Sequence, residues 1–303
     1  MTEAFVAGVD VGGTTIKGGV VAANGATSEP VSPWRTASGD AQAVAECIAE
    51  FVAELRHAEP RVAAVGIGVP GIVDEARGVA LYAVNVPLRD VALRDHVATE
   101  TGLPVVLGHD VRMAARGEAA YGSARGYSDY LFVSIGTGVG AAVVIHGQPY
   151  AGAHHAGGEL GHMVVMPGGP RCACGKRGCV EAVASGRALE SRYRAAGGSA
   201  DVLATDLPAA DDERARAVWN EGLDALALAL ANYVTLLDPQ AIVVGGGLAA
   251  VGAPLLTGIS TRLGSSLLPF QKMPAITAGA LGADAGWRGA AAAAWDLLRS
   301  NGA

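Results

Sequence analysis

The stretch FVAGVDVGGTTIKGGVVAANG, residues 5–25, points to the fold of the whole chain. It contains an apolar run, a glycine-rich turn, a second apolar run and a terminal Asn24-Gly25. Two apolar runs separated by turn residues predict a β-hairpin, with Thr14 and Thr15 near its turn.

The same pattern returns in YLFVSIGTGVGAAVVIHG, residues 130–147, about 125 positions further along. A repeated hairpin unit predicts two related α/β lobes. We expect the first lobe to span residues 1–109 plus a C-terminal helix at about 288–303, and the second to span residues 110–287. The expected strands are 61–73, 104–110 and 241–247, and the expected helices are 40–58 with Asp40 as N-cap, 111–122, 185–196, 211–237 and 284–299.

The composition limits the class of protein. Half of the 303 residues are hydrophobic and 17% are charged, as in a globular protein rather than a disordered one. The net charge of −7, without a run of lysine or arginine, argues against nucleic acid as a partner. No apolar run approaches the roughly 20 residues of a membrane helix, and the N-terminus does not resemble a secretory signal. We therefore expect a cytoplasmic protein with reduced cysteines and no membrane partner.

The turn of the first hairpin, Asp10-Val-Gly-Gly-Thr-Thr, could bind an anion. Gly12 and Gly13 would let backbone N–H groups approach it, and the hydroxyl groups of Thr14 and Thr15 could donate to it. The Asp10 carboxylate would hold a metal-bound water. An ordinary hairpin turn is the alternative.

The second hairpin has Gly136-Thr137-Gly138 at its turn, and two such hairpins across a cleft could hold nucleotide phosphates from both sides. The pattern is neither the Rossmann fingerprint, because a strand follows each turn, nor a Walker A loop. Gly245-Gly246-Gly247 follows a predicted strand and could let an adenine ring or ribose lie close to the backbone. The start of a helix is the alternative reading of these three glycines.

Asp110 lies where a predicted strand gives way to a helix. Its carboxylate could cap that helix, or it could project into a cleft between the lobes as a general base for a substrate hydroxyl. The sequence leaves both roles open.

Three of the four cysteines lie in GELGHMVVMPGGPRCACGKRGCVE, residues 158–181. His162, Cys172, Cys174 and Cys179 could supply one nitrogen and three sulfurs to a tetrahedral zinc ion. Four protein ligands leave no open position, so such a zinc would be structural. A redox pair or three small buried residues are the alternatives.

Glu159 and Glu181 flank this cluster, and folding the loop around zinc would bring both carboxylates into one neighbourhood. Paired carboxylates accept hydrogen bonds from vicinal hydroxyls, as in sugar sites. Two solvated surface glutamates are the alternative.

Together these motifs resemble the ROK family of bacterial sugar kinases and repressors, most of all its glucokinase branch. DVGGTTIKGGVV resembles the family's first phosphate motif, SIGTGVGAAVV its second, and IVVGGG its adenosine motif, while GELGH followed by CACGKRGCVE matches the signature ExGH…CxCGxxGCxE. The resemblance spans residues 5 to about 290. It implies two α/β lobes of the hexokinase–actin–heat-shock type (ribonuclease H-like), with sugar and ATP in the cleft between them.

The resemblance also implies roles for individual residues. Asp110 would be the catalytic base, and zinc would orient the sugar-binding residues near its ligands. The residues implied to bind the sugar are Gly71, Asn85, His109, Asp110, Glu159, His162 and Glu181. The residues implied to bind the nucleotide are Asp10, Gly12, Gly13, Thr14, Thr15, Lys17, Gly136, Thr137, Gly138, Gly245, Gly246 and Gly247.

One departure from the family pattern concerns the catalytic step. The family usually reads Asn-Asp there, often with a second Asn two residues later, whereas this chain reads His109-Asp110-Val111-Arg112. The family's Asn contacts sugar hydroxyls, and a histidine lacks the paired donor and acceptor of an amide. The identity of the sugar therefore stays open.

The leading interpretation is an ATP- and Mg²⁺-dependent hexose kinase acting on a 6-hydroxyl, with glucose expected because it is the commonest substrate of this branch. N-acetylmannosamine, N-acetylglucosamine, allose and fructose are the alternative substrates. The rivals are a sugar-responsive regulator, which would carry a helix-turn-helix domain ahead of Asp10, a sugar-binding protein without catalysis, and a polyphosphate-dependent glucokinase, whose relatives generally lack the cysteine signature. A homodimer is expected from the family.

Overall fold

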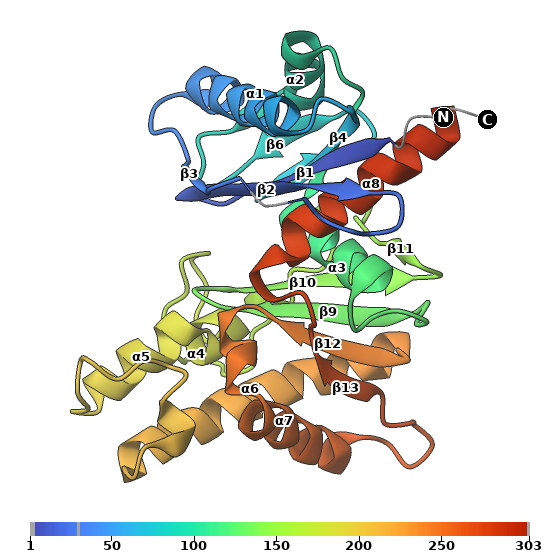
Figure 1. Cartoon of the computed structure of the whole chain (residues 1–303). Helices are drawn as coiled ribbons and strands as arrows, with labels where there is room; N and C mark the ends of the chain where they lie inside the picture. Colours follow the sequence, from blue (N-terminus) through green and yellow to red (C-terminus); the bar gives the residue numbers. More distant parts are fainter. Residues whose placement is uncertain (1–3, 29–30, 302–303) are drawn as a thin grey trace. The chain divides into compact units, whose positions relative to one another are not determined.

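The computed structural model describes residues 4–28 and 31–301, so residues 1–3, 29, 30, 302 and 303 of the expected first lobe lie outside the described residues. The chain divides into two compact units (Figure 1). The first unit holds the described residues up to Arg125, Ala151–Ala156 and the C-terminal segment from Ala283. The second holds Gly126–Tyr150 and Gly157–Gly282. This division places the helix that starts at Asp110 in the first unit, whereas the boundary expected from the sequence lies before it.

The first unit is built on a five-stranded sheet in the order β3-β2-β1-β4-β8. β1 and β2 form the expected hairpin, and β1, β4 and β8 run parallel to one another. The strands are β1 (Phe5–Val11), β2 (Thr15–Ala22), β3 (Trp34–Arg35), β4 (Val62–Val69) and β8 (Val105–His109).

The second unit repeats this topology with the sheet order β11-β10-β9-β12-β13. β9 and β10 form the second hairpin, and β9, β12 and β13 run parallel. The repeated topology confirms the two related α/β lobes expected from the two hairpins. The strands are β9 (Tyr130–Ile135), β10 (Val139–Ile145), β11 (Gln148–Pro149), β12 (Ala241–Gly245) and β13 (Ala275–Ala278).

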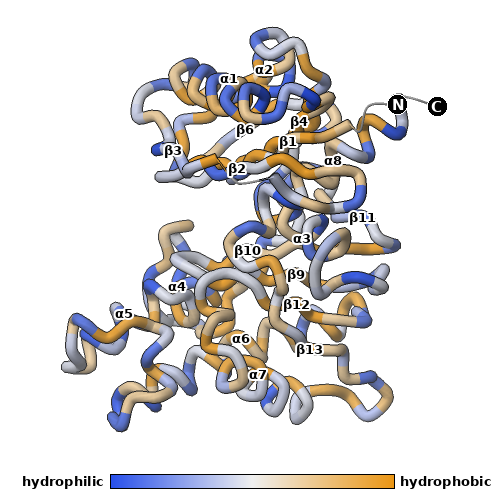
Figure 2. The backbone as a smooth tube through the Cα atoms, viewed as in Figure 1, coloured by the Kyte–Doolittle hydropathy of each residue, from blue (hydrophilic) through white to orange (hydrophobic). Residues whose placement is uncertain are grey.

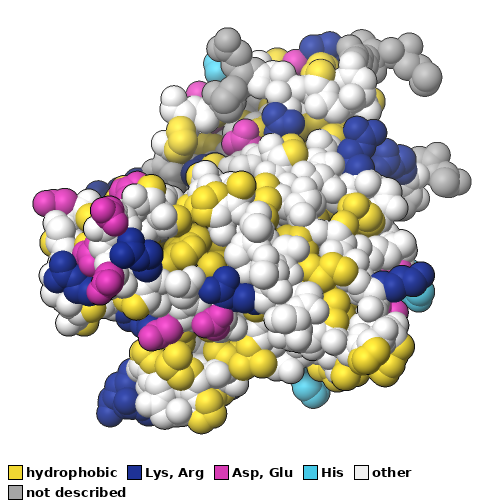
Figure 3. Space-filling view, turned by 90° about the horizontal axis from the view of Figure 1, so that it is seen from below, with side chains coloured by type: hydrophobic (Ala, Val, Ile, Leu, Met, Phe, Trp, Pro, Cys, Tyr) yellow, Lys and Arg dark blue, Asp and Glu magenta, His cyan; other side chains and the backbone are white. Residues whose placement is uncertain are grey.

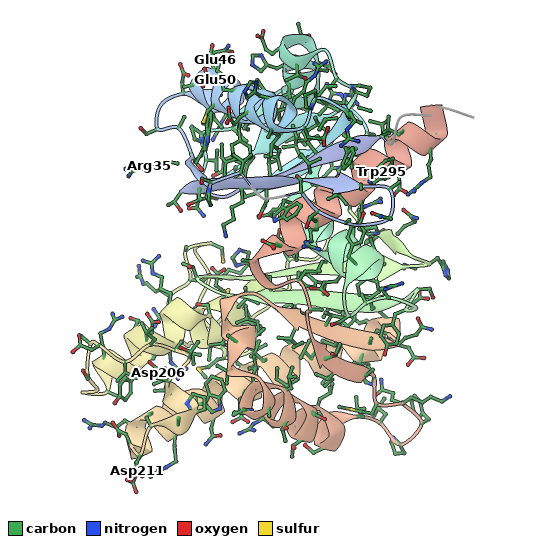
Figure 4. The ribbon with its side chains drawn as sticks, viewed as in Figure 1. Arg35, Glu46, Glu50, Asp206, Asp211 and Trp295 are labelled. Carbon is green, nitrogen blue, oxygen red and sulfur yellow. The ribbon has the colours of Figure 1, made fainter. Side chains whose placement is uncertain are left out.

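Helices cover both faces of the first sheet (Figure 1). α1 (Ala41–Ala58) packs its buried residues, among them Phe51, on one face, while Glu46 and Glu50 point outward from this helix (Figure 4). Asp40 caps α1 as predicted, because its side chain accepts a hydrogen bond from the Ala43 N–H at 3.0 Å. The unit also contains a three-stranded sheet of β5 (Ile72–Asp74), β6 (Val79–Tyr82) and β7 (Arg89–Val91). Its other helices are α2 (Leu93–Thr101), α3 (Asp110–Tyr121) and α8 (Ala285–Asn301).

α8 lies very close to the opposite face of the first sheet. A β-carbon at Gly8 would overlap the carbonyl oxygen of Trp287, and one at Gly66 would overlap that of Ala290. α3 approaches α8 just as closely, because a β-carbon at Gly289 would overlap the backbone of Met113. The alanine- and glycine-rich sequence of the last helix is therefore explained by this close packing.

The second unit has a separate hydrophobic core, in which the inward side chains of β9, β10 and β12 meet the long helix α6. The apolar residues of β9 and β12 are orange in the hydropathy colouring of Figure 2. Its helices are α4 (Val180–Ala184), α5 (Gly186–Ala195), α6 (Glu213–Leu237) and α7 (Ala253–Ser266), with short 3₁₀ turns at Leu160–His162, Leu207–Ala209 and Gly247–Val251. A further 3₁₀ turn, Gly282–Asp284, directly precedes α8.

The surface of the protein carries mixed charge. On the face seen in Figure 3, lysine and arginine side chains are interspersed with aspartate and glutamate rather than gathered into one band. Within the described residues, no helix combines the length and the apolar character needed to cross a bilayer.

Candidate functional site

The site residues of the first unit follow the carboxyl ends of neighbouring parallel strands. Asp10 near the end of β1 pairs in register with Gly68 of β4, and Val69 of β4 pairs with His109 at the end of β8. Parallel α/β sheets bind ligands at this edge. The sheet therefore brings Asp10, the turn at Gly71 and Asp110 to one edge of the unit.

The turn of the first hairpin is tight and leaves its tip exposed. The Gly12 N–H donates to the carbonyl of Thr15 at 2.9 Å, and the Thr36 hydroxyl donates to the carbonyl of Gly12 at 2.7 Å. Gly13 and Thr14 are the exposed residues of the tip. Because the Gly12 N–H is used inside the hairpin, an approaching anion would meet the tip rather than this group.

Asp10 lies in a crowded position beneath this turn. Burial raises the pKa of Asp10 to about 6, and Lys17, directly opposite on β2, partly offsets that rise. The first turn of α8 approaches the carboxylate so closely that a β-carbon at Gly286 would lie 2.6 Å from it. The last helix was expected in the first lobe, but its contact with Asp10 was not predicted.

Two further expected sugar contacts, Gly71 and Asn85, also belong to the first unit. Gly71 has a φ of 94°, and a β-carbon there would overlap the backbone of Tyr82, so the turn itself requires glycine. Asn85 is exposed, and its β-carbon would lie 3.1 Å from a β-carbon placed at Gly13. Asn85 therefore lies beside the tip of the first hairpin.

Asp110 is the first residue of α3, and the N-cap position belongs to His109. Its Oδ1 atom lies 2.7 Å from the backbone nitrogen of Val111 and 3.2 Å from Nε2 of His109. The side chain of Asp110 is 29% exposed and that of His109 is 13% exposed. Asp110 is thus a partly accessible carboxylate at the start of a helix, where its negative charge is favoured.

An ion pair between Arg112, which is buried, and Glu75 supports this junction and was not predicted from the sequence. Nε of Arg112 donates to Oε1 of Glu75 at 2.7 Å, and the backbone N–H of His109 donates to the same oxygen at 3.2 Å. The Arg112 side chain is only 3% exposed. A charged residue on the buried side of a helix was the one available signal, and pairing it with Glu75 required the fold.

In the second unit the loop after β11 gathers the predicted zinc ligands. One ligand atom from each of His162, Cys172, Cys174 and Cys179 lies within 4.8 Å of every other. Nδ1 of His162 is 3.6 Å from Sγ of Cys172, and the sulfurs of Cys174 and Cys179 are 3.6 Å apart. Zinc–sulfur bonds of about 2.3 Å in a tetrahedron separate two sulfurs by about 3.8 Å, so this set fits zinc.

The protonation chemistry of the cluster also fits a cation. Burial raises the pKa of Cys179 to about 12 and also raises the pKa of Cys172, whereas a hydrogen bond from the Lys176 backbone lowers the pKa of Cys174. Crowded thiols resist ionisation unless a positive charge compensates them, and a bound metal ion supplies that charge.

The two glutamates contact this cluster from different sides. Oε2 of Glu159 is 3.9 Å from Nε2 of His162, the ring nitrogen opposite the one that faces Cys172. Oε2 of Glu181 accepts a hydrogen bond from the Val139 N–H at 3.1 Å, and its Oε1 is 3.9 Å from Sγ of Cys172. Glu181 thus joins the cysteine loop to the second hairpin.

The second hairpin and the glycine run meet at the carboxyl ends of β9 and β12. A β-carbon at Gly245 would contact the Phe132 ring at 2.7 Å, and one at Gly246 would lie 2.5 Å from the carbonyl of Ile135. A β-carbon at Gly247 would meet nothing within 4 Å. Close packing therefore accounts for the first two glycines, and Gly247 is the one with open space beside it.

A cavity of about 310 Å³ in the second unit connects the hairpin tip with the cysteine loop. Thr137, Cys172 and Glu181 contribute to its wall. Arg171 and Arg187 also border it and give it positive charge. Its chemistry suits an anionic group next to the second hairpin.

Comparisons with known proteins agree with these features. The chain is 33% identical to a glucokinase of Thermotoga maritima, over 96% of this chain and 97% of the relative. It is also 33% identical to an N-acetyl-D-glucosamine kinase of Escherichia coli O157:H7, over 94% of this chain and 97% of the relative. A ROK family glucokinase from Streptomyces griseus, solved in complex with glucose and AMPPNP, superposes with a TM-score of 0.83 at 33% identity, over 96% of this chain and 99% of that one.

The comparison with the Streptomyces griseus enzyme confirms the two-lobed α/β fold class expected from the resemblance. The model of the family described as ROK matches residues 6–296, nearly the whole chain. The chain belongs to the ROK family.

Proposed function

We propose that this protein is an ATP-dependent hexose kinase that phosphorylates the 6-hydroxyl of glucose. The observation that carries the proposal is the 33% identity to a glucokinase over 96% of the chain. The functional motifs of that resemblance lie at the carboxyl ends of parallel strands in each unit, where α/β proteins bind their ligands.

In this proposal Asp110 accepts the proton of the sugar 6-hydroxyl. The oxygen then forms a bond to the γ-phosphorus of ATP, the bond from that phosphorus to the β–γ bridging oxygen breaks, and ADP leaves with the electron pair. A general base must be accessible to a substrate that enters from solvent. The Asp110 side chain, directly after β8, is 29% exposed and meets this condition.

The hairpin tips, with Thr14 in one unit and Thr137 in the other, would position the phosphates through their hydroxyl groups. Asp10 is an oxygen donor of the kind that suits Mg²⁺, and it would hold a magnesium-bound water. Mg²⁺ bound with ATP would supply charge neutralisation at the transferring phosphoryl group.

The sugar would be held in the second unit by Glu159, His162 and Glu181. Zinc bound by His162 and the three cysteines would fix these groups, because His162 contacts Glu159 and Cys172 contacts Glu181. The zinc is therefore assigned an indirect role in activity.

The test is coupled ADP release with ATP and Mg²⁺ across a panel of hexoses and N-acetylhexosamines. Turnover with glucose supports the proposal, and turnover only with N-acetylglucosamine would reassign the substrate, since a kinase of that sugar is equally identical to this chain. The absence of turnover with every sugar, from zinc-loaded protein that binds sugar in calorimetry, would favour a sugar-binding regulator instead.

The homodimer and the cytoplasmic location are part of the same proposal. Light scattering coupled to gel filtration would test the dimer, and a mass of about one 30.3 kDa chain would contradict it.

A further inference from the structure

We propose that His109 is a positioning residue, which holds the carboxylate of Asp110 by donating the Nε2 hydrogen of a neutral imidazole to Oδ1. The inference deepens the proposed function, because it assigns a role to the residue that replaces the family's asparagine. It differs from the expectation that His109 itself contacts the sugar.

The geometry places the ring against the carboxylate. Nε2 of His109 lies 3.2 Å from Oδ1 of Asp110, within hydrogen-bonding distance for a ring nitrogen and an oxygen. Adjacent residues can make this contact here because His109 is the last extended residue of β8 and Asp110 the first residue of α3.

The surroundings keep the imidazole neutral. Burial, together with the positive charge of Arg112, lowers the pKa of His109 to about 3. At pH 7 the ring therefore carries one N–H, and the neighbouring carboxylate is the acceptor for it. This places the hydrogen on Nε2 and leaves the lone pair on Nδ1.

The other ring nitrogen has no role toward a ligand in this geometry. Nδ1 of His109 is buried and makes no hydrogen bond to any of the described residues. With Nε2 directed to Asp110, the ring offers no polar atom to a sugar hydroxyl. A neutral ring that contacts only the base can affect the reaction through the base alone.

The backbone of His109 is fixed by Glu75 and Arg112. Oε1 of Glu75 accepts hydrogen bonds from the His109 backbone N–H at 3.2 Å and from Nε of Arg112 at 2.7 Å. Nη1 of Arg112 is also 3.5 Å from the carbonyl oxygen of His155. These contacts fix the backbone at the strand–helix junction, so the ring is positioned before any substrate arrives.

Oδ1 of Asp110 thus receives two contacts, from His109 Nε2 and from the Val111 N–H at 2.7 Å. Together they set the plane of the carboxylate. A general base is effective only when its acceptor oxygen is aligned with the departing proton, so loss of one contact should lower kcat more than it changes binding.

The experiment compares two substitutions of His109 in the full-length, zinc-loaded protein. In His109→Gln the amide nitrogen can occupy the position of Nε2 and keep the donor, whereas His109→Leu keeps an apolar filler without a donor. We expect the glutamine variant to retain kcat within about threefold, and the leucine variant to lose roughly 10- to 100-fold in kcat with the sugar KM changed less than about twofold.

Two outcomes would overturn the assignment. A leucine variant with an unchanged kcat would show that Asp110 does not depend on the ring. A raised sugar KM at normal kcat would instead make His109 a sugar contact. Thermal unfolding of each variant controls for loss of fold.

A second measurement does not depend on activity. Long-range ¹H–¹⁵N spectra of the wild-type histidine rings, with the His109 signal identified by its loss in His109→Gln, should show the Nε2–H tautomer unchanged from pH 5 to 8. The charged groups nearest to His109 are Asp110 and Arg112 on α3, and Glu75 after β5, which accepts from its backbone N–H. An Nδ1–H tautomer or a protonated ring would refute the proposal, whereas inactivity of the wild type with all sugars would refute only the kinase assignment.

Discussion

At the scale of single residues, the proposed chemistry depends on carboxylates whose surroundings differ. Asp110 is partly exposed at a helix start and contacts two donors, which suits a charged base. Asp10 lies under a glycine turn against α8, where burial favours its protonated form. The sequence named both residues, but only the fold distinguishes their environments.

Substituting Asp110 with Asn should leave sugar binding nearly intact and reduce kcat by roughly 10²- to 10⁴-fold, because the amide cannot accept the hydroxyl proton. Calorimetric sugar binding and steady-state kinetics on the same preparation would measure both effects. Asp296→Asn, an exposed substitution on α8, is the matched control and should retain full kcat. Turnover of the Asp110 variant close to that of wild type would remove this residue from the role of base.

Substituting Asp10 with Asn should stabilise the metal-free protein at pH 7. The pKa of Asp10 in the folded state, about 6, lies above its usual value, so the folded state binds this proton more tightly than the unfolded chain. The unfavourable contribution is therefore present above pH 6 and disappears as the pH falls toward 4. We expect a gain of roughly 1 to 3 kcal/mol in the free energy of unfolding at pH 7.

Urea unfolding of the Asp10 variant at pH 7 and pH 4 would measure this difference. Asp211→Asn is the control, since Asp211 is fully exposed (Figure 4) and its substitution should change stability by less than about 0.5 kcal/mol. An equal effect of Asp10→Asn at both pH values would contradict the role of burial.

At the scale of elements, hairpins and strong amphipathic helices could be predicted, and weakly patterned helices could not. α1 was evident from its apolar spacing and the Asp40 cap. α2 starts after Ala92 without a side-chain cap and buries only Leu93 and Val97, so its sequence gave little signal. α7 likewise begins after Gly252 without a side-chain cap.

The cysteine loop was predictable as a ligand set because residue type and spacing determine zinc chemistry. Its connection to the second hairpin was not, since the bond from the Val139 N–H to Glu181 joins segments far apart in the sequence. Glycines gave a mixed signal: Gly245 and Gly246 are required by packing, and only Gly247 has open space for a ligand.

Substituting Cys174 with Ser should abolish stoichiometric zinc binding, because it removes one of the four ligands. Sugar binding should also weaken, because the bound zinc no longer fixes the loop that positions Glu159 and Glu181. Cys47→Ser is the matched control, since Cys47 lies on α1 outside the cluster and should leave one zinc per chain. Metal content by mass spectrometry and sugar affinity by calorimetry would be compared. Unchanged zinc in the Cys174 variant would refute the four-ligand assignment.

Two glycine substitutions test the close packing of α8. Gly289→Ala should destabilise the protein by about 2 to 4 kcal/mol, because the new β-carbon would overlap the backbone of Met113. Gly264→Ala in α7 is exposed with nothing within 4 Å and should stabilise by up to about 1 kcal/mol through helix propensity. Urea unfolding would measure both, and a neutral Gly289→Ala would mean that the two helices separate easily.

At the scale of the whole molecule, the two related units could be predicted from the sequence, because each begins with a hairpin whose strands are adjacent in the chain. Each hairpin belongs to a sheet of the same topology. Which segments of the chain belong to which unit was harder to predict. α3 directly follows the first sheet's last strand, but its packing partner α8 comes at the far end of the chain. No local pattern can reveal a contact between segments so distant.

The connectivity makes the first unit dependent on its last helix, and a truncation tests this. Ending the chain after Gly282 removes α8, whose Trp287, Ala291 and Ala294 form a buried cluster with strand residues of the first sheet. Hydrogen exchange should then accelerate in β1 and β4, while β9 and β12 keep their protection because their core lies within the second unit. Zinc content serves as the control and should stay at one per chain, since all four ligands remain. Slow exchange in β1 and β4 of the truncated chain would show that the first sheet folds without α8, and lost protection in β9 would show that the second unit also needs it.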